Sequence, residues 1–261
     1  MRIAVAGAAG RMGQRILNLA AADPELSIGA AYDVPAHAGE ELRLETGETI
    51  TLSADARVAV AHAEVLIDFT VADAVLDNLQ AASAAGVATV IGATGLDPHT
   101  LAELDDLAAR VPVVYAPNMS LGVNLLFKLV AEVAGALGPE YNIEIVETHH
   151  NQKQDSPSGT AVRLAELAAE ARGLDYNTHV RHGREGMVGV SPQDEIGVHA
   201  LRGGDVAGEH TVSLIGPGER IELTHRAHTR DNFARGALTA AKWVGHQRPG
   251  RYDMLDVLGL R

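Results

Sequence analysis

The first 116 residues repeat one pattern, in which a short apolar run is followed by a stretch with Leu, Val and Ala at helical spacing. Strands that alternate with helices in this way are typical of βαβ units around a parallel sheet. We expect strands at residues 2–7, 27–32, 65–69, 88–91 and 113–115, and helices at 72–85 and 100–109. This half is therefore predicted to be a doubly wound α/β domain.

The pattern changes after residue 120. Helices are expected at 122–137 and 158–172 with a strand at 142–147 between them, and then strand candidates at 195–201, 210–215 and 220–226 follow one another without helices. Such a run favours a mixed or antiparallel sheet, so a second, α+β domain is predicted. The pattern of the last expected helix, 232–245, does not decide which domain it joins.

Composition excludes several classes of function. The chain has no cysteine, which rules out disulfides and thiol nucleophiles, and 34 acidic against 21 basic residues give a net charge of −13, which repels nucleic acid. No apolar run approaches the roughly 18 residues that span a bilayer, and the start at Met1 lacks the regions of a secretory signal. We expect a cytoplasmic protein with no membrane and no nucleic-acid partner.

A glycine-rich turn lies between the first expected strand and the helix after it. Such a turn allows a pyrophosphate to approach the backbone N–H groups at a helix N-terminus. The spacing is G-x-x-G-x-x-G rather than G-x-G-x-x-G, so a simple tight turn is the alternative. The residues expected to hold the pyrophosphate are Gly7, Ala8, Ala9, Gly10, Arg11 and Met12.

Asp33 follows the second expected strand, twenty residues after Gly13. A dinucleotide-binding fold of the Rossmann type places a carboxylate there, on the adenosine ribose, although an Asp after a strand is also a common turn residue. The 2′-phosphate of NADP at about 4 Å from this carboxylate would be repelled by roughly 4 kcal/mol. Arg11 opposes that effect, since a guanidinium can bind the phosphate. We predict NADH as the preferred cofactor, with NADPH possible.

Residues 147–161 are dense with polar chemistry. His149 and His150 end a strand, Lys153 follows in a loop, and Ser158 opens a helix whose N–H groups can bind a carboxylate. Histidine can transfer protons near neutral pH. The alternatives are a structural loop and a metal site. Adjacent histidines on a strand point to opposite faces and make poor joint ligands, so no metal is expected.

At these residues the chain resembles the 4-hydroxy-tetrahydrodipicolinate reductases, also called dihydrodipicolinate reductases, of diaminopimelate and lysine biosynthesis. Residues 147–161 satisfy every fixed position of the family's E-x-H-H-x-x-K-x-D-x-P-S-G-T-A core. Further similar segments are V-A-G-A-A-G-R-M-G at 5–13, I-D-F-T at 67–70, G-A-T-G at 92–95, A-P-N-M-S at 116–120, R-G-G-D at 202–205 and G-E-H at 208–210.

The resemblance implies roles for individual residues. His149 and Lys153 would be the catalytic proton-transfer groups. A small dicarboxylate substrate would be bound by His150, Ser158, Gly159 and Thr160. The nicotinamide end of the cofactor would be surrounded by Gly92, Ala93, Thr94, Ala116, Pro117, Asn118 and Met119. The implied reaction is NAD(P)H-dependent reduction of 4-hydroxy-tetrahydrodipicolinate to tetrahydrodipicolinate.

The resemblance also implies the domain plan. A dinucleotide-binding domain would comprise residues 1–120 and about 229–261, and residues of about 121–228 would bind substrate and form a homotetramer. Val34 stands where NADP-competent members carry Arg, and Ala93 and Met119 replace Thr and Phe. Two alternatives are another nicotinamide-dependent dehydrogenase of amino or oxo acids, and a noncatalytic NAD(H) sensor. A sensor that binds DNA would need a basic recognition helix, and none is visible.

Overall fold

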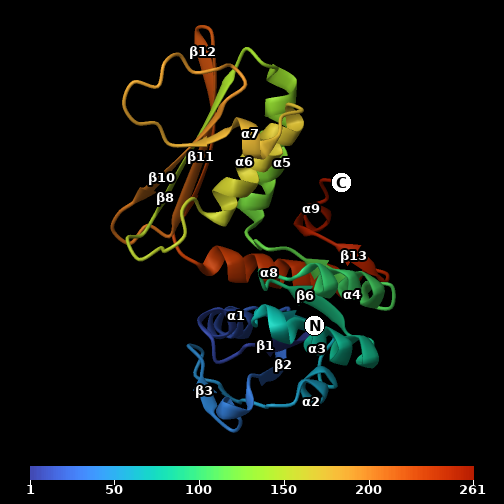
Figure 1. The fold of residues 1–261 in the computed structure, drawn as a ribbon. Coiled ribbons are helices and arrows are strands. Elements are labelled where there is room, and N and C mark those ends of the chain that lie inside the picture. Colours follow the sequence, from blue (N-terminus) through green and yellow to red (C-terminus); the bar gives the residue numbers. More distant parts are fainter. The chain divides into compact units, whose positions relative to one another are not determined.

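The chain forms two compact units. The computed structural model describes all 261 residues. Unit 1 comprises Met1–Leu121 and Asp231–Arg261, and unit 2 comprises Gly122–Arg230 (Figure 1). Unit 1 is therefore assembled from both ends of the sequence, and unit 2 is one continuous insertion.

Unit 1 is built on a six-stranded sheet in the order β13-β7-β6-β5-β1-β2, in which every pairing is parallel. Its strands are β1 (Arg2–Ala6), β2 (Ser27–Tyr32), β5 (Val65–Asp68), β6 (Ala88–Ile91), β7 (Pro112–Tyr115) and β13 (Gly250–Tyr252). Its helices are α1 (Arg11–Ala21), α2 (Ala56–Val60), α3 (Ala72–Ala85), α4 (Pro98–Ala108), α8 (Asp231–Val244) and α9 (Met254–Val257), with a 3₁₀ turn η1 (Pro35–His37) and a hairpin of β3 (Glu41–Arg43) and β4 (Thr49–Thr51).

The central strands of unit 1 are buried along their whole length, which explains the apolar runs from which they were predicted. Every residue of β5 and of β6 is buried, as expected where helices cover both faces of a parallel sheet. Two expected strands are one residue too long. β1 ends before Gly7 because Gly7 has φ of +70°, and β5 ends at Asp68, whose carboxylate accepts the Thr70 N–H. The predicted fold class is confirmed.

The C-terminal segment completes unit 1. Helix α8 is the last helix expected from the sequence, and β13 adds the edge strand next to β7. Neither β13 nor the short elements between residues 35 and 60 are predicted from the sequence, since strands of three residues are too short to show a hydrophobic period.

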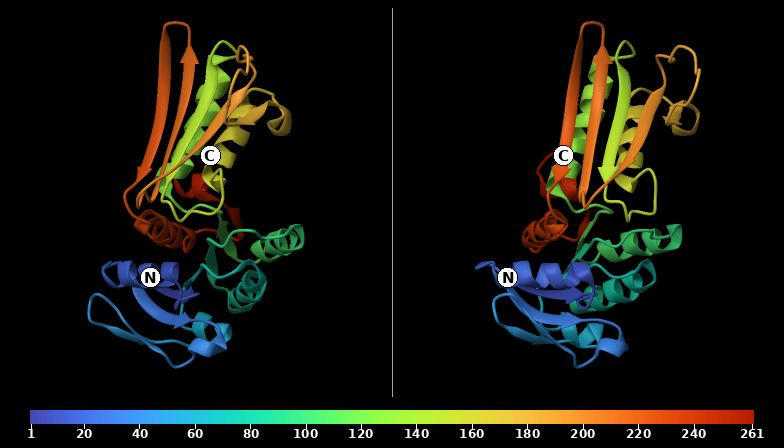
Figure 2. Two further views of the ribbon diagram at one scale, coloured as in Figure 1. Left: turned by 60° about the vertical axis from the view of Figure 1, so that its left-hand side comes forward. Right: turned by 90° about the vertical axis from the view of Figure 1, so that its left-hand side faces the viewer.

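Unit 2 is a five-stranded mixed sheet with helices on one face. Its elements are α5 (Leu121–Leu137, which starts at the boundary with unit 1), β8 (Asn142–His149), α6 (Gly159–Ala171), α7 (Tyr176–His179), β9 (Val180–His182), β10 (Ile196–Arg202), β11 (Gly208–Gly216) and β12 (Glu219–Ala227). The order is β12-β11-β8-β10-β9, with β11 antiparallel to β8 and to β12 and the other pairs parallel. Figure 2 shows α5 and α6 along one face of this sheet and no helix on the other.

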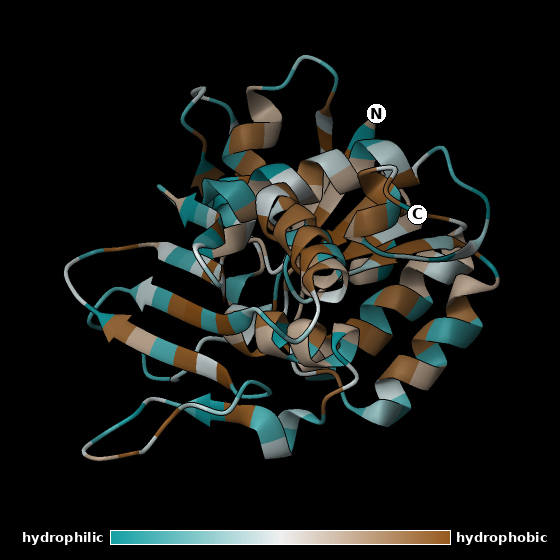
Figure 3. Ribbon diagram, turned by 90° about the horizontal axis from the view of Figure 1, so that it is seen from above, coloured by the Kyte–Doolittle hydropathy of each residue, from teal (hydrophilic) through white to brown (hydrophobic).

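Buried and more exposed residues alternate along the strands of unit 2, as expected for a sheet that helices cover on one face only. In β8, Ile143 and Ile145 are buried while the residues between them are half-exposed, and the strands of unit 2 show the same banding in Figure 3. The buried residues pack against Leu164 and its neighbours on α6. None of the helices has the length and apolar character that crossing a bilayer requires.

Candidate functional site

The glycine turn of unit 1 is shaped by close backbone approaches. A Cβ at Gly13 would lie 2.2 Å from the Gly7 carbonyl oxygen, so α1 packs directly on the turn. A Cβ at Gly7 would lie 3.1 Å from the Phe69 carbonyl oxygen, and its positive φ also favours glycine. The turn thus needs glycine at both positions, and it presents backbone at the start of a helix.

The Asp33 carboxylate lies against this turn. Asp33 follows the last residue of β2, and its Oδ2 accepts the Ala9 N–H at 2.8 Å while its Oδ1 accepts the Val34 N–H at 2.8 Å. Both bonds fix the carboxylate at the edge of a cavity of about 490 Å³. The cavity is lined by Gly7, Ala9, Gly10 and Asp33, by Tyr32 at the end of β2, by His37, by Phe69 and Thr70 after β5, and by Asn78 on α3.

The other expected cofactor residues fall into two groups. Ala8 is buried within the turn, and Arg11 and Met12 form the first turn of α1. Gly92, Ala93 and Thr94 follow β6, while Ala116, Pro117, Asn118 and Met119 follow β7. The two segments are neighbours at the carboxyl edge of the sheet, because the Ala116 N–H donates to the Ile91 carbonyl oxygen. They do not line the 490 Å³ cavity.

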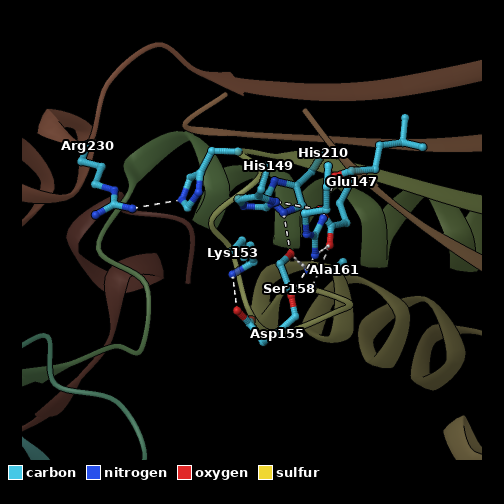
Figure 4. A network of polar contacts seen from close by, with 11 residues as sticks. Glu147, His149, Lys153, Asp155, Ser158, Ala161, His210 and Arg230 are labelled. Atoms are coloured by element: carbon cyan, nitrogen blue, oxygen red, sulfur yellow. Dashed lines mark hydrogen bonds and ion pairs between the residues drawn. The ribbon is translucent and has the colours of Figure 1, made fainter. Parts of the chain in front are cut away.

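In unit 2, a buried carboxylate organises the predicted catalytic segment (Figure 4). Glu147 is fully buried on β8 and accepts two hydrogen bonds from Arg202, Nη1 to Oε2 at 2.8 Å and Nη2 to Oε1 at 2.9 Å. It also bonds His149 Nδ1 at 2.7 Å and accepts the Ser158 N–H at 2.9 Å. Burial raises the pKa of Glu147, but these bonds outweigh it and the pKa lies below its usual value. Glu147 is therefore ionised.

An ionised Glu147 determines the tautomer of His149. A carboxylate only accepts hydrogen bonds, so His149 Nδ1 carries the hydrogen and Nε2 is left for exchange with a ligand. Burial lowers the pKa of His149, and the bond to Glu147 offsets this only in part. His149 Nε2 lies where a Cβ on Gly208 would meet it at 3.0 Å. The side chain is thus neutral at pH 7 and closely packed.

Helix α6 begins beside this carboxylate. Ser158 caps the helix, since its Oγ accepts the Ala161 N–H at 3.2 Å, and Oγ lies 2.9 Å from His210 Nε2. Gly159 is exposed, and a Cβ there would meet nothing within 4 Å. The start of α6 at Gly159 is therefore open to a ligand and carries the positive end of the helix dipole.

Basic side chains lie around the same segment. The Lys153 ammonium is 2.8 Å from Asp155 Oδ1, and the Lys153 side chain is 19% exposed. Arg230 Nη2 donates to His150 Nε2 at 3.2 Å, so this nitrogen of His150 carries a lone pair. Figure 4 shows His149 and Lys153 on the same side of unit 2 as Ser158, whereas Arg230 lies farther out. No group of three His, Asp or Glu side chains is arranged to hold a metal ion.

Comparisons with known proteins agree along the whole chain. The family described as dihydrodipicolinate reductase, N-terminus, matches residues 1–119, and its C-terminal counterpart matches residues 122–258. The chain belongs to the dihydrodipicolinate reductase family. The resemblance predicted from sequence is thereby confirmed.

Curated relatives support the same membership in the dihydrodipicolinate reductase family. The 4-hydroxy-tetrahydrodipicolinate reductases of Citrifermentans bemidjiense and Geotalea uraniireducens are 49% and 50% identical, each over 100% of both chains. A dipicolinate-bound dihydrodipicolinate reductase from Paenisporosarcina sp. TG-14 is 25% identical with a TM-score of 0.79 over 98% of both chains. As a family member, the chain is an oxidoreductase that reduces 4-hydroxy-tetrahydrodipicolinate in lysine biosynthesis, and the family uses NAD(P)H.

Sequence reasoning missed several side chains of the site in this reductase. Glu147, Arg202 and His210 were quoted as parts of similar segments but were given no role. The register brings them together, because His210 pairs with Glu147 and Arg202 pairs with His149. The available signal was a glutamate that follows Ile143 and Ile145 on the same face of a strand, since a buried carboxylate requires charged or N–H partners.

Proposed function

We propose that unit 1 binds the reduced dinucleotide and that unit 2 binds the dicarboxylate around the first turn of α6. The observation that carries this proposal is the buried Glu147, which bonds both His149 and the Ser158 N–H and so joins a proton-transfer group to a carboxylate-binding helix start. The division of the chain into two units is consistent with separate cofactor and substrate domains.

The residues of unit 1 fit a dinucleotide. Gly7 to Met12 would hold the pyrophosphate, Asp33 the adenosine ribose, and the segments after β6 and β7 the nicotinamide end. The bound cofactor supplies the hydride. Asp33 is held by two backbone N–H groups, so it cannot easily turn away from a 2′-phosphate. Val34 offers no compensating charge, and NADH is therefore the preferred cofactor and NADPH the poorer one.

The residues of unit 2 fit a dicarboxylate. One carboxylate would accept the N–H groups of Gly159 and Thr160, next to Ser158 at the start of the helix, and His150 and Lys153 would supply further donors. The net charge of −13 does not oppose this, since charges more than about 8 Å away are screened at physiological salt.

The proton-transfer groups differ in their resting state. The reaction removes the 4-hydroxyl of the substrate as water and adds a hydride and a proton to the ring. His149 rests neutral with Nδ1–H on Glu147, so its Nε2 would accept a proton from the substrate carbon and return it to the departing hydroxyl. The Lys153 ammonium would donate the proton that accompanies the hydride. A positioned group of this kind contributes about 10² to 10⁴ in rate.

An absorbance assay tests the proposal. NADH and NADPH oxidation would be followed with the condensation product of pyruvate and aspartate semialdehyde, made in situ. Lys153→Ala and His149→Ala are expected to lower turnover at least 100-fold with an unchanged Kd for NADH, and NADH is expected to give the higher kcat/KM. The matched controls are Lys128→Ala and His179→Ala, whose side chains pair with Glu132 and Asp194 elsewhere in unit 2. Near-normal turnover of both site variants would overturn the assignment.

We further propose that the enzyme is a cytoplasmic homotetramer built through the helix-free face of the unit 2 sheet. That face carries the exposed side chains of Leu201 and Ile215 next to polar residues of β8 and β11. Light scattering after size-exclusion chromatography is expected to give four times the 27.4 kDa chain mass. A monomer at micromolar concentration would refute the assembly.

A further inference from the structure

His210 is a buried titratable side chain that the proposed mechanism does not use. It is 3% exposed on β11, directly opposite Glu147 of β8. Its Nε2 bonds Ser158 Oγ, but its Nδ1 is buried without any partner. An unpartnered buried nitrogen lowers stability, and an apolar side chain of similar volume would avoid that loss. Packing alone therefore does not account for an imidazole at this position.

The hydrogen bonds of Ser158 indicate another role for the imidazole. Ser158 Oγ accepts the Ala161 N–H and also makes a hydrogen bond with His210 Nε2. The Ser158 N–H in turn donates to Glu147. The residue immediately before Gly159 is thus held by β8 through its backbone and by β11 through its side chain. Its orientation determines where the first N–H groups of α6 point.

Burial keeps His210 neutral. The titratable groups that face it are Glu147 and His149 on β8, Lys153 in the following loop and His225 on β12, and of these only Glu147 favours the protonated imidazole. Burial, with repulsion from His149, lowers the pKa of His210 to about 3. A neutral imidazole therefore keeps its hydrogen bond to the Ser158 hydroxyl near pH 7. The His149 ring meets the His210 ring edge-on, with centroids 5.2 Å apart.

We propose that His210 is a positioning residue for substrate binding, which holds the Ser158 hydroxyl and so aims the Gly159 and Thr160 N–H groups at the substrate carboxylate. This inference rests on the proposed substrate site in unit 2. His210 does not touch the substrate, and it acts on KM more than on kcat.

Substitutions at position 210 separate the hydrogen bond from the packing. His210→Phe fills the volume without an acceptor, and His210→Asn has an amide too short to reach Ser158. Both are expected to raise the substrate KM about three- to tenfold, the equivalent of one hydrogen bond, with an unchanged Kd for NADH. His210→Gln places an amide oxygen near the position of Nε2 and is expected to restore KM to within about twofold of wild type, an effect well below one hydrogen bond. If the His210→Phe variant does not fold, the positioning role is tested by comparing the substrate KM of His210→Asn with that of His210→Gln.

His225→Phe is the matched control. His225 pairs with His210 across β11 and β12 and makes no hydrogen bond to Ser158. The substrate KM of the His225→Phe variant is therefore expected to equal that of the wild type. Ser158→Ala is expected to raise KM, and the double variant with His210→Phe should be no worse than the more impaired single variant. Equal KM values for the Phe, Asn and Gln variants would refute the positioning role.

A separate variant distinguishes failure of the inference from failure of the proposed function. Gly159→Pro removes one N–H at the first helical position, where proline is tolerated. If Gly159→Pro raises KM while His210→Phe behaves like His225→Phe, the positioning role alone is wrong. If neither Gly159→Pro nor Ser158→Ala changes KM, the proposed substrate site itself is wrong.

Discussion

Replacing Glu147 by glutamine tests how the site is built. The wild-type carboxylate takes part in four hydrogen bonds, with two donors of Arg202, His149 Nδ1 and the Ser158 N–H. Glutamine keeps the shape but offers one oxygen and one NH₂ group. It cannot accept from all four donors, and its NH₂ group favours the opposite tautomer of His149. Both stability and turnover are expected to fall.

The two losses have different magnitudes. Removing one partner of a buried ion pair costs about 3–5 kcal/mol. Arg202 keeps bonds to the Asp155 and Leu201 carbonyl oxygens, so we expect the lower end, about 3 kcal/mol. The mispositioned His149 is expected to lower kcat about 100-fold or more. Because Glu147 raises the pKa of His149, its loss moves the acidic limb of the kcat profile to lower pH.

The assay has a matched control on the same strand. Glu144 is bonded by Arg184 through both oxygens and by His199, but it lies on the opposite face of β8. Urea unfolding should show a similar loss of stability for Glu144→Gln, whereas its kcat should stay near wild type, with assembly checked by light scattering. A Glu147→Gln enzyme that keeps kcat within about threefold, far short of a general-base effect, and an unchanged pH limb would refute the reasoning.

Two further predictions concern the cofactor turn and pH. Gly13→Ala places a Cβ 2.2 Å from the Gly7 carbonyl oxygen, so the turn must shift. The Kd for NADH, measured by fluorescence, is expected to rise about tenfold or more, which corresponds to about 1.4 kcal/mol. Binding of dipicolinate by unit 2 should not change. The folded pKa of His210 is about 3 against 6.5 unfolded, so its contribution to stability is present above pH 6.5 and is lost as pH falls toward 3. From pH 7 to pH 5 wild type should lose about 2 kcal/mol more than His210→Phe in urea unfolding, and equal losses would contradict this.

The repeated pattern of the first half predicted the fold class correctly because fully buried strands leave continuous apolar runs. The strands over 27–32 and 88–91 match to the residue. Helix α8 could not be placed from its sequence, since an amphipathic helix packs equally well on either sheet. Its place depends on contacts with residues far away in the chain, such as the close approach of Gly236 to the Met119 carbonyl oxygen.

Sequence reasoning found the polar segment of the site but not its organisation. His149, Lys153 and Ser158 stand close together in the chain, so their spacing already indicated a common site. Arg202 and His210 lie more than fifty residues from Glu147 and His149, and only the strand register places them beside those two residues. A register shift of one residue would turn those side chains to the other face. That register depends on pairing between segments far apart in the chain, which the polar segment by itself does not show.

A crystal structure with pyridine-2,6-dicarboxylate and NADH tests the central claim most directly. We predict that one carboxylate of the diacid accepts the Gly159 and Thr160 N–H groups, with Lys153 and His150 at the ring and His149 Nε2 facing it. Density for the diacid at another surface of the chain, with the first turn of α6 left to solvent, would contradict the account.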